Sequence, residues 1–118
     1  MYREIKVGEK SIPMKATGAT PIRYRMLFKE DVLNEFTHVD GNYSVAIDTI
    51  SKLAFIMTMA ATGEDMSKLS MEGYVSWLDQ FEPFDLTNAA DSIVDLYVGN
   101  TIGTSEVKKK ARGAVKEN

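Results

Sequence analysis

Residues 54–61 read AFIMTMAA, and Thr58 is the only polar residue among them. They form the second half of a helix that we expect over about 44–62. The first half is amphipathic, because apolar residues recur on one side while Asp48 and Lys52 lie on the other. A helix that is apolar all round has to be enclosed, either by its own fold or by a partner. Enclosure by its own fold is the more ordinary outcome, and the sequence leaves both open.

The chain before this helix begins with a pattern typical of a β-hairpin over about 3–16. Polar and apolar residues alternate on both sides of a turn at Gly8–Glu9, which gives the hairpin one apolar face. That face consists of Ile5, Val7, Ile12 and Met14. Because Pro13 has no N–H to donate, its strand is expected at a sheet edge or with a bulge.

A first helix is expected to begin at Thr20–Pro21, where a hydroxyl cap precedes a proline at the first helical position. Its apolar face consists of Tyr24, Leu27 and Phe28. Asp31 is expected to cap a second, short helix. The turn-forming residues from His38 to Asn42 predict a loop before the long helix.

Two more amphipathic helices are expected after the long one. Their apolar stripes are Tyr74, Trp77, Leu78 and Phe81, and then Ala89, Ile93, Leu96 and Tyr97. We expect Asp85 or Thr87 to cap the last helix, and Gly99 and Gly103 to stop it. Residues 104–118 show no apolar periodicity and predict a mobile basic tail.

These segments predict an α+β fold that is mostly α, with an N-terminal β-hairpin followed by a bundle of four or five helices between about 20 and 100. Residues 1–103 are expected to form a single globular domain. The 118-residue chain is 44% hydrophobic and 26% charged, which is typical of one folded soluble domain. No apolar run approaches the ~20 residues of a membrane-spanning helix, so we expect no membrane partner.

The net charge of −3 conceals a segregation of charge along the chain. Residues 1–29 carry seven basic and two acidic residues, and residues 108–118 carry five basic residues and one acidic residue. Residues 30–107 between them carry fourteen acidic residues and only two basic ones. Such opposite segments can pair within a subunit or between copies. An acidic body also repels phosphates, so nucleic acid is disfavoured as a partner.

Few residues are suited to catalysis or to metal binding. The chain has no Cys and a single His, His38, which excludes thiol nucleophiles, zinc–thiolate sites and multi-histidine metal sites. Residues 40–51 resemble the start of a calcium loop, but Val45 replaces its turn glycine and Ser51 its terminal glutamate. No carboxylate falls in an apolar segment where burial would raise its pKa. We therefore expect no enzyme, no cofactor and no metal.

Four segments of the chain resemble the tail assembly chaperones of long-tailed bacteriophages, in particular those of phages and prophages of Gram-positive bacteria. The segments read IKVGEKSIPMKA (5–16), TPIRYRMLFKEDVL (20–33), KLAFIMTMAA (52–61) and YVSWLDQF (74–81). The likeness spans roughly residues 3–98, and its most telling part is RYRMLF followed by DVL. The family has no active-site motif to carry over.

The resemblance implies a protein that coats the long, helical tape measure protein before the tail tube assembles and helps to recruit the major tail protein. It also implies work in the host bacterial cytoplasm, absence from the mature virion, and in many relatives a longer form made by ribosomal frameshifting. The run Lys108–Lys110 is compatible with a slippery codon stretch, and a solvated basic tail explains it equally well.

Self-association is also expected, because many copies with a modest apolar groove each can cover a long partner through avidity. Methionines in and beside the long helix would let such a groove adapt, although ordinary core filling explains them too. The expected groove residues lie on the long helix and the one after it, and two arginines are expected against acidic helices. The expected partner-binding residues are Arg23, Arg25, Phe55, Met59, Tyr74 and Trp77.

Two other functions remain open on the sequence. A structural head–tail connector or tail-completion protein of a phage would be present in finished particles, whereas a chaperone would be missing from them. A small DNA-binding regulatory module would depend on the basic residues 108–118 and would bind in a salt-sensitive way.

Overall fold

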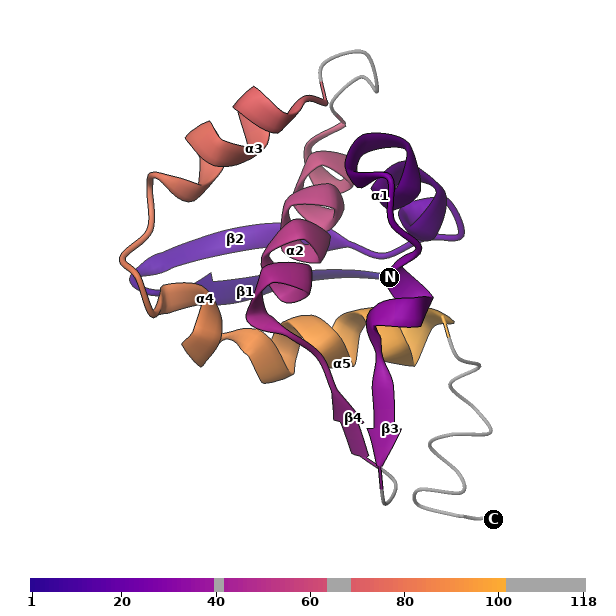
Figure 1. Ribbon diagram of the computed structural model, residues 1–118. Coiled ribbons are helices and arrows are strands. Elements are labelled where there is room, and N and C mark those ends of the chain that lie inside the picture. The colour runs from indigo at the N-terminus through magenta and orange to yellow at the C-terminus, as the bar shows by residue number, and fades with distance from the viewer. Residues whose placement is uncertain (40–41, 64–68, 102–118) are drawn as a thin grey trace.

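The central element is helix α2 (Ile47–Thr62), around which the other elements are placed (Figure 1). The computed structural model describes residues 1–39, 42–63 and 69–101. The remaining elements are β1 (Tyr2–Val7), β2 (Lys10–Lys15), α1 (Thr20–Phe28), the 3-10 helix η1 (Val32–Glu35), β3 (Thr37–Val39), β4 (Asn42–Ser44), α3 (Met71–Leu78), α4 (Asp85–Asn88) and α5 (Ala90–Thr101). This confirms the expected α+β fold that is mostly α.

Strands β1 and β2 form the predicted antiparallel hairpin, in which Ile5 lies opposite Ile12. Its predicted apolar face is buried, since all four of its residues are at most 7% exposed. Pro13 lies opposite Glu4 in a two-stranded sheet, so its strand is an edge, as its missing N–H requires. The backbone pair Met1 and Ala16, which exchange two hydrogen bonds of 2.7 and 2.8 Å, extends the hairpin by one residue pair.

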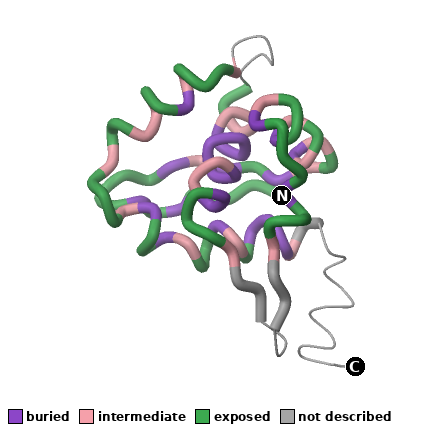
Figure 2. The backbone as a smooth tube through the Cα atoms, in the orientation of Figure 1, coloured by how far each residue is buried: buried purple, intermediate pink, exposed green. Residues whose placement is uncertain are grey.

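The apolar half of α2 is enclosed by the protein's own fold. Residues 53–58 are all buried, and α2 packs on β2, α1, α3, α4 and α5 (Figure 2). The next three residues, 59–61, are partly buried. The helix therefore needs no partner to cover its central turns. Its C-terminus is set by Gly63, whose φ of 76° is a left-handed conformation that glycine adopts without strain.

Helix α1 differs from the sequence expectation at its start. Its N-cap is Ala19, and Thr20 is a buried helical residue whose Oγ1 accepts a hydrogen bond from the Thr17 N–H at 2.9 Å. At its other end Lys29 adopts a left-handed conformation that stops the helix. Asp31 then caps η1 as predicted, because its Oδ1 accepts a hydrogen bond from the Leu33 N–H.

The segment expected as a loop contains a second antiparallel hairpin, β3–β4, in which Val39 pairs with Asn42. The prediction of a loop over His38–Asn42 and of a helix from residue 44 was therefore wrong at both points. Residues 42–44 pair with β3, so they cannot belong to α2, which begins three residues later.

The C-terminal helical region is broken where one helix was expected. Helices α4 and α5 meet at Ala89, and Asp85 lies inside α4 rather than at its cap. Helix α5 also continues past Gly99 to Thr101, so this glycine does not end it. The expected stop at Gly103 and the tail over 104–118 lie outside the described residues.

A candidate partner-binding surface

Six aromatic side chains from α1, α2, α3 and the segment after α3 form one continuous row, called here the aromatic row. In order along it they are Tyr24, Phe28, Tyr74, Phe55, Trp77 and Phe81. Neighbouring ring centroids are 5.0 to 5.5 Å apart, and the rings are tilted or edge-to-face, the geometries that aromatic pairs prefer. The row joins α3 to α1 and to α2.

The structure brings three of the four expected groove residues together in this row, but as packing within the subunit. Phe55 is 2% exposed and Tyr74 is 5% exposed. Met59 and Trp77 are only partly buried and pack against the core. Of the four, Met59 and Trp77 alone keep some surface that a partner can touch.

The two expected arginines lie on α1, with Arg25 exposed and Arg23 partly buried. Two exposed apolar residues, which the sequence analysis did not single out, lie between these arginines on the helix surface. Ile22 is 45% exposed and Met26 is 56% exposed. These two are four residues apart and so are neighbours on one side of the helix. We call them the α1 stripe.

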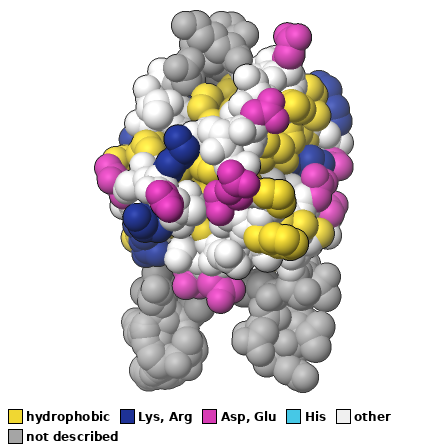
Figure 3. Space-filling model, turned by 90° about the vertical axis from the view of Figure 1, so that its left-hand side faces the viewer, with side chains coloured by type: hydrophobic (Ala, Val, Ile, Leu, Met, Phe, Trp, Pro, Cys, Tyr) yellow, Lys and Arg dark blue, Asp and Glu magenta, His cyan; other side chains and the backbone are white. Residues whose placement is uncertain are grey.

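Helix α3 has a comparable feature that the sequence analysis also missed. Met71 and Val75, again four residues apart, are 51% and 52% exposed. We call them the α3 stripe. Two exposed acidic residues lie on this segment, Glu72 in the first turn of the helix and Asp79 at its C-cap. On the face of the molecule that carries α3, hydrophobic side chains lie among charged ones (Figure 3).

The signal that could have found the α1 stripe is the spacing of apolar residues on the side away from the predicted core face. Tyr24 is two residues from both Ile22 and Met26. Residues two apart in a helix do not share a face. Two apolar faces on one helix were thus visible in the sequence, but only the structure shows which face the core covers.

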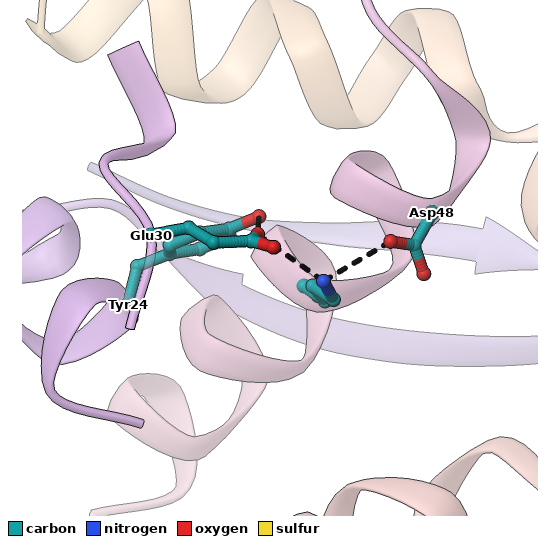
Figure 4. Close-up of polar contacts among 4 residues, drawn as sticks. Tyr24, Glu30 and Asp48 are labelled. Carbon is teal, nitrogen blue, oxygen red and sulfur yellow. Dashed lines mark hydrogen bonds and ion pairs between the residues drawn. The ribbon is translucent and has the colours of Figure 1, made fainter. Parts of the chain in front are cut away.

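A cluster of polar side chains links α2 to Glu30, in the segment after α1 (Figure 4). The Nζ of Lys52 lies 3.2 Å from a carboxylate oxygen of Glu30 and 3.0 Å from one of Asp48. The Tyr24 hydroxyl lies 3.5 Å from the same Glu30 oxygen. The ammonium group also sits 5.3 Å from the centre of the Phe28 ring, a cation–π contact. The cluster therefore places charged groups next to Tyr24 and Phe28, at one end of the aromatic row.

The pKa values of three side chains in and beside this cluster are raised. Burial raises the pKa of Tyr24 to about 12, and burial, followed by the Asp48 charge, raises the pKa of Tyr74 to about 12. Burial acts to lower the pKa of Lys52, but hydrogen bonds to Asp48 and Glu30 outweigh it and raise that pKa. All three shifts favour the protonated form, so none supplies an acid or base that titrates near neutral pH.

An open cavity of about 400 Å³ lies beside the hairpin turn. It is lined by Val7, Gly8, Glu9, Lys10, Gln80, Glu82 and Asp85.

Within the described ranges, no group of three or more His, Asp or Glu side chains could hold a metal ion. In the same part of the chain, no helix has both the length and the apolar character needed to cross a bilayer.

Comparison of the chain with models of protein families, with curated proteins and with solved structures found no match.

Proposed function

We propose that this protein is a non-enzymatic tail assembly chaperone of a long-tailed bacteriophage. In this role it coats the tape measure protein, associates with further copies of itself and helps to recruit the major tail protein. It acts in the host bacterial cytoplasm and is absent from the mature virion. The proposal starts from the resemblance of residues 3–98 to that family.

One structural observation supports the proposal most: the apolar core closes without a partner, yet α1 and α3 each keep an apolar stripe on the surface. The α1 stripe (Ile22 and Met26) and the α3 stripe (Met71 and Val75) are each between 45% and 56% exposed. A folded body with exposed apolar residues on short helices is suited to contact other helices. Each stripe is small, so tight coverage of a long partner requires many copies acting together.

The chemistry of the stripes suits a partner whose surface varies along its length. Each stripe contains one methionine, Met26 or Met71. The methionine side chain is unbranched and polarizable, so it adapts to differently shaped apolar surfaces. Partly exposed Met59 and Trp77 extend the apolar surface that a partner helix can use.

The test is co-expression with the tape measure protein encoded in the same phage genome. We expect this chain to keep the tape measure protein in the soluble fraction and to co-purify with it. The double variant Met26→Ser with Val75→Ser should lose most of this effect, while Ile47→Ser, which removes an exposed apolar residue at the start of α2, should keep it. A tape measure protein that stays insoluble with the wild-type chain would contradict the proposal.

A further inference from the structure

We infer that copies of this chain associate head-to-tail, with α1 of one copy packed against α3 of the next. The inference rests on the self-association that is part of the proposed function, and it adds the contact surface. It uses only the two stripes and the charges beside them.

The α1 stripe combines apolar and basic character. Ile22 and Met26 lie on the side of α1 opposite Tyr24, which is fully buried. Arg23 and Arg25, the only charged residues of the helix, are next in sequence to these two. Helix α1 therefore presents an apolar strip between two cations and has no acidic residue of its own.

The α3 stripe combines apolar and acidic character. Met71 and Val75 lie beside Glu72, the only charged residue within the helix, and Asp79 follows at the C-cap. Both carboxylates belong to exposed residues. Helix α3 thus presents an apolar strip of the same length as that of α1, with the opposite charge beside it.

These two surfaces complement each other in apolar character and in charge. Apolar side chains would meet in the centre, and the arginines of α1 would lie near the carboxylates of α3 at the rim. Complementary charges at a rim align partners and disfavour like-with-like pairing. Two α1 stripes would bring four arginines together, and two α3 stripes would bring carboxylates together. The charge pattern therefore favours contact of α1 with α3 over contact of α1 with α1 or of α3 with α3.

The two stripes of one copy cannot meet each other. Phe28, on the core side of α1, contacts Tyr74 of α3 with ring centroids 5.0 Å apart. The core side of α1 therefore faces α3 within the subunit, and the α1 stripe, on the opposite side, faces away from it. Pairing of unlike surfaces on separate copies is a heterologous contact, which builds an open chain or a ring rather than a closed dimer.

The contact is expected to be weak for a single pair of copies. Helices of nine and eight residues with two exposed apolar residues each bury far less than the ~1,200 Å² of a standard stable interface. Association should therefore increase with protein concentration and decrease as salt screens the rim charges. Stripes that pair between copies cover each other, so along such a chain a long partner would contact the partly exposed Met59 and Trp77. By aligning copies it would strengthen their contact through effective concentration.

The test is sedimentation velocity of the full chain alone over a range of concentrations at low salt. Wild type should show a sedimentation coefficient that rises with concentration. Met26→Glu places a negative charge against acidic α3, and Val75→Lys places a positive charge against basic α1. Each single variant should weaken association about tenfold or more.

An equimolar mixture of the two single variants should associate again. The mixture contains one contact between two unaltered stripes and one between the new glutamate and the new lysine. Recovery would not occur if α1 paired with α1 or α3 with α3. The matched control Ile47→Glu alters an apolar residue that is 43% exposed at the far end of α2, and it should sediment as wild type does.

A wild type that stays monomeric at every concentration would overturn the inference, as would single variants that associate normally or a mixture that stays monomeric. Circular dichroism of each variant establishes that it is folded. Because no tape measure protein is present, these results are independent of the co-expression test. The chaperone proposal can therefore survive the failure of this contact.

Discussion

Gly8 combines two constraints at the turn between β1 and β2. Its φ is 65°, a left-handed conformation, and a Cβ at this position would collide with the carboxylate of Asp85. Moving that carboxylate aside would break the hydrogen bond of 2.9 Å that its Oδ2 accepts from the Glu82 N–H. The hairpin turn therefore packs closely against the start of α4 because residue 8 has no side chain.

We predict that Gly8→Ala destabilises the protein by about 2 kcal/mol or more, from left-handed strain of roughly 1–2 kcal/mol plus the collision. In an Asp85→Ala background the same substitution should cost only the strain. Urea denaturation of the two single variants and the double variant measures the difference. Equal costs of Gly8→Ala in both backgrounds would show that the carboxylate does not matter.

Thr58 is a buried polar residue in the apolar half of α2. It is 5% exposed, and its Oγ1 has no hydrogen-bond partner among the described residues. A buried hydroxyl without a partner costs roughly 1–3 kcal/mol. Thr58→Val keeps the shape and removes the hydroxyl, so it should stabilise the protein by about 1 kcal/mol. Thermal unfolding measures this, and a lower melting temperature than that of wild type would contradict it.

The raised tyrosine pKa values predict a loss of stability at alkaline pH. An unfolded tyrosine titrates near pH 10, whereas the pKa values of Tyr24 and Tyr74 are raised to about 12 by burial. Above pH 10 the unfolded chain therefore releases protons that the folded protein still holds, so the free energy of unfolding falls as pH rises from 10 to 12. The raised pKa of Lys52 acts in the same direction.

Urea denaturation between pH 9 and 11 tests this dependence. Tyr24→Phe removes one of the two buried phenols and should make the decline with pH less steep. Tyr2→Phe removes a phenol that is 54% exposed and should change the slope much less. A slope that is the same in wild type and Tyr24→Phe would contradict the account.

At the scale of elements, α3 depends on the aromatic row for its place beside α1 and α2. Tyr74 is the link, because its ring lies 5.0 Å from that of Phe28 and 5.4 Å from that of Phe55. We predict that Tyr74→Ala destabilises the protein by about 3–5 kcal/mol, the usual cost of deleting a buried aromatic ring. Hydrogen exchange should also become faster across α3.

Val75→Ala, one residue further along the same helix, is the matched control. Val75 is 52% exposed, so this substitution should leave stability within about 0.5 kcal/mol of wild type. If Tyr74→Ala and Val75→Ala have the same effect on exchange in α3, the aromatic row does not hold the helix.

The sequence predicted those elements whose apolar period is long enough to detect. The β1–β2 hairpin shows alternation over two six-residue strands, and α2 shows helical spacing in its first half followed by the apolar run 54–61. Strands β3 and β4 have three residues each, which is too short for a period to appear. The available signal was Asp-Gly at 40–41 between strand-forming residues, a frequent hairpin sequence.

The candidate surface was predictable only in part. Helical periodicity identifies apolar residues but does not state which of two apolar faces packs inward. Phe55 and Tyr74 were expected at a surface and lie in the core, whereas Met26 and Val75 lie at the surface. The decision is made by packing between distant elements, which for α1 and α3 is the ring contact between Phe28 and Tyr74.

At the scale of the whole molecule, this chain combines a closed core with two short helices that each bear an exposed apolar stripe. The charged residues beside the stripe are basic on α1 and acidic on α3. A closed core allows the protein to exist alone, and the strips allow it to contact helices of another chain or of a second copy. If it acts as a chaperone, mass spectrometry of purified virions should detect tail proteins but not this chain. Its presence in stoichiometric amounts would instead indicate a structural component of the particle.

The claim that this protein shields the apolar helices of the tape measure protein is tested most directly by light scattering. Tape measure protein diluted from denaturant should aggregate alone and scatter light strongly. With increasing wild-type chain the scattering should fall until several copies are present per tape measure chain, and Met26→Ser with Val75→Ser should require a larger excess. Scattering that is unchanged by a large excess of the wild-type chain would contradict the claim.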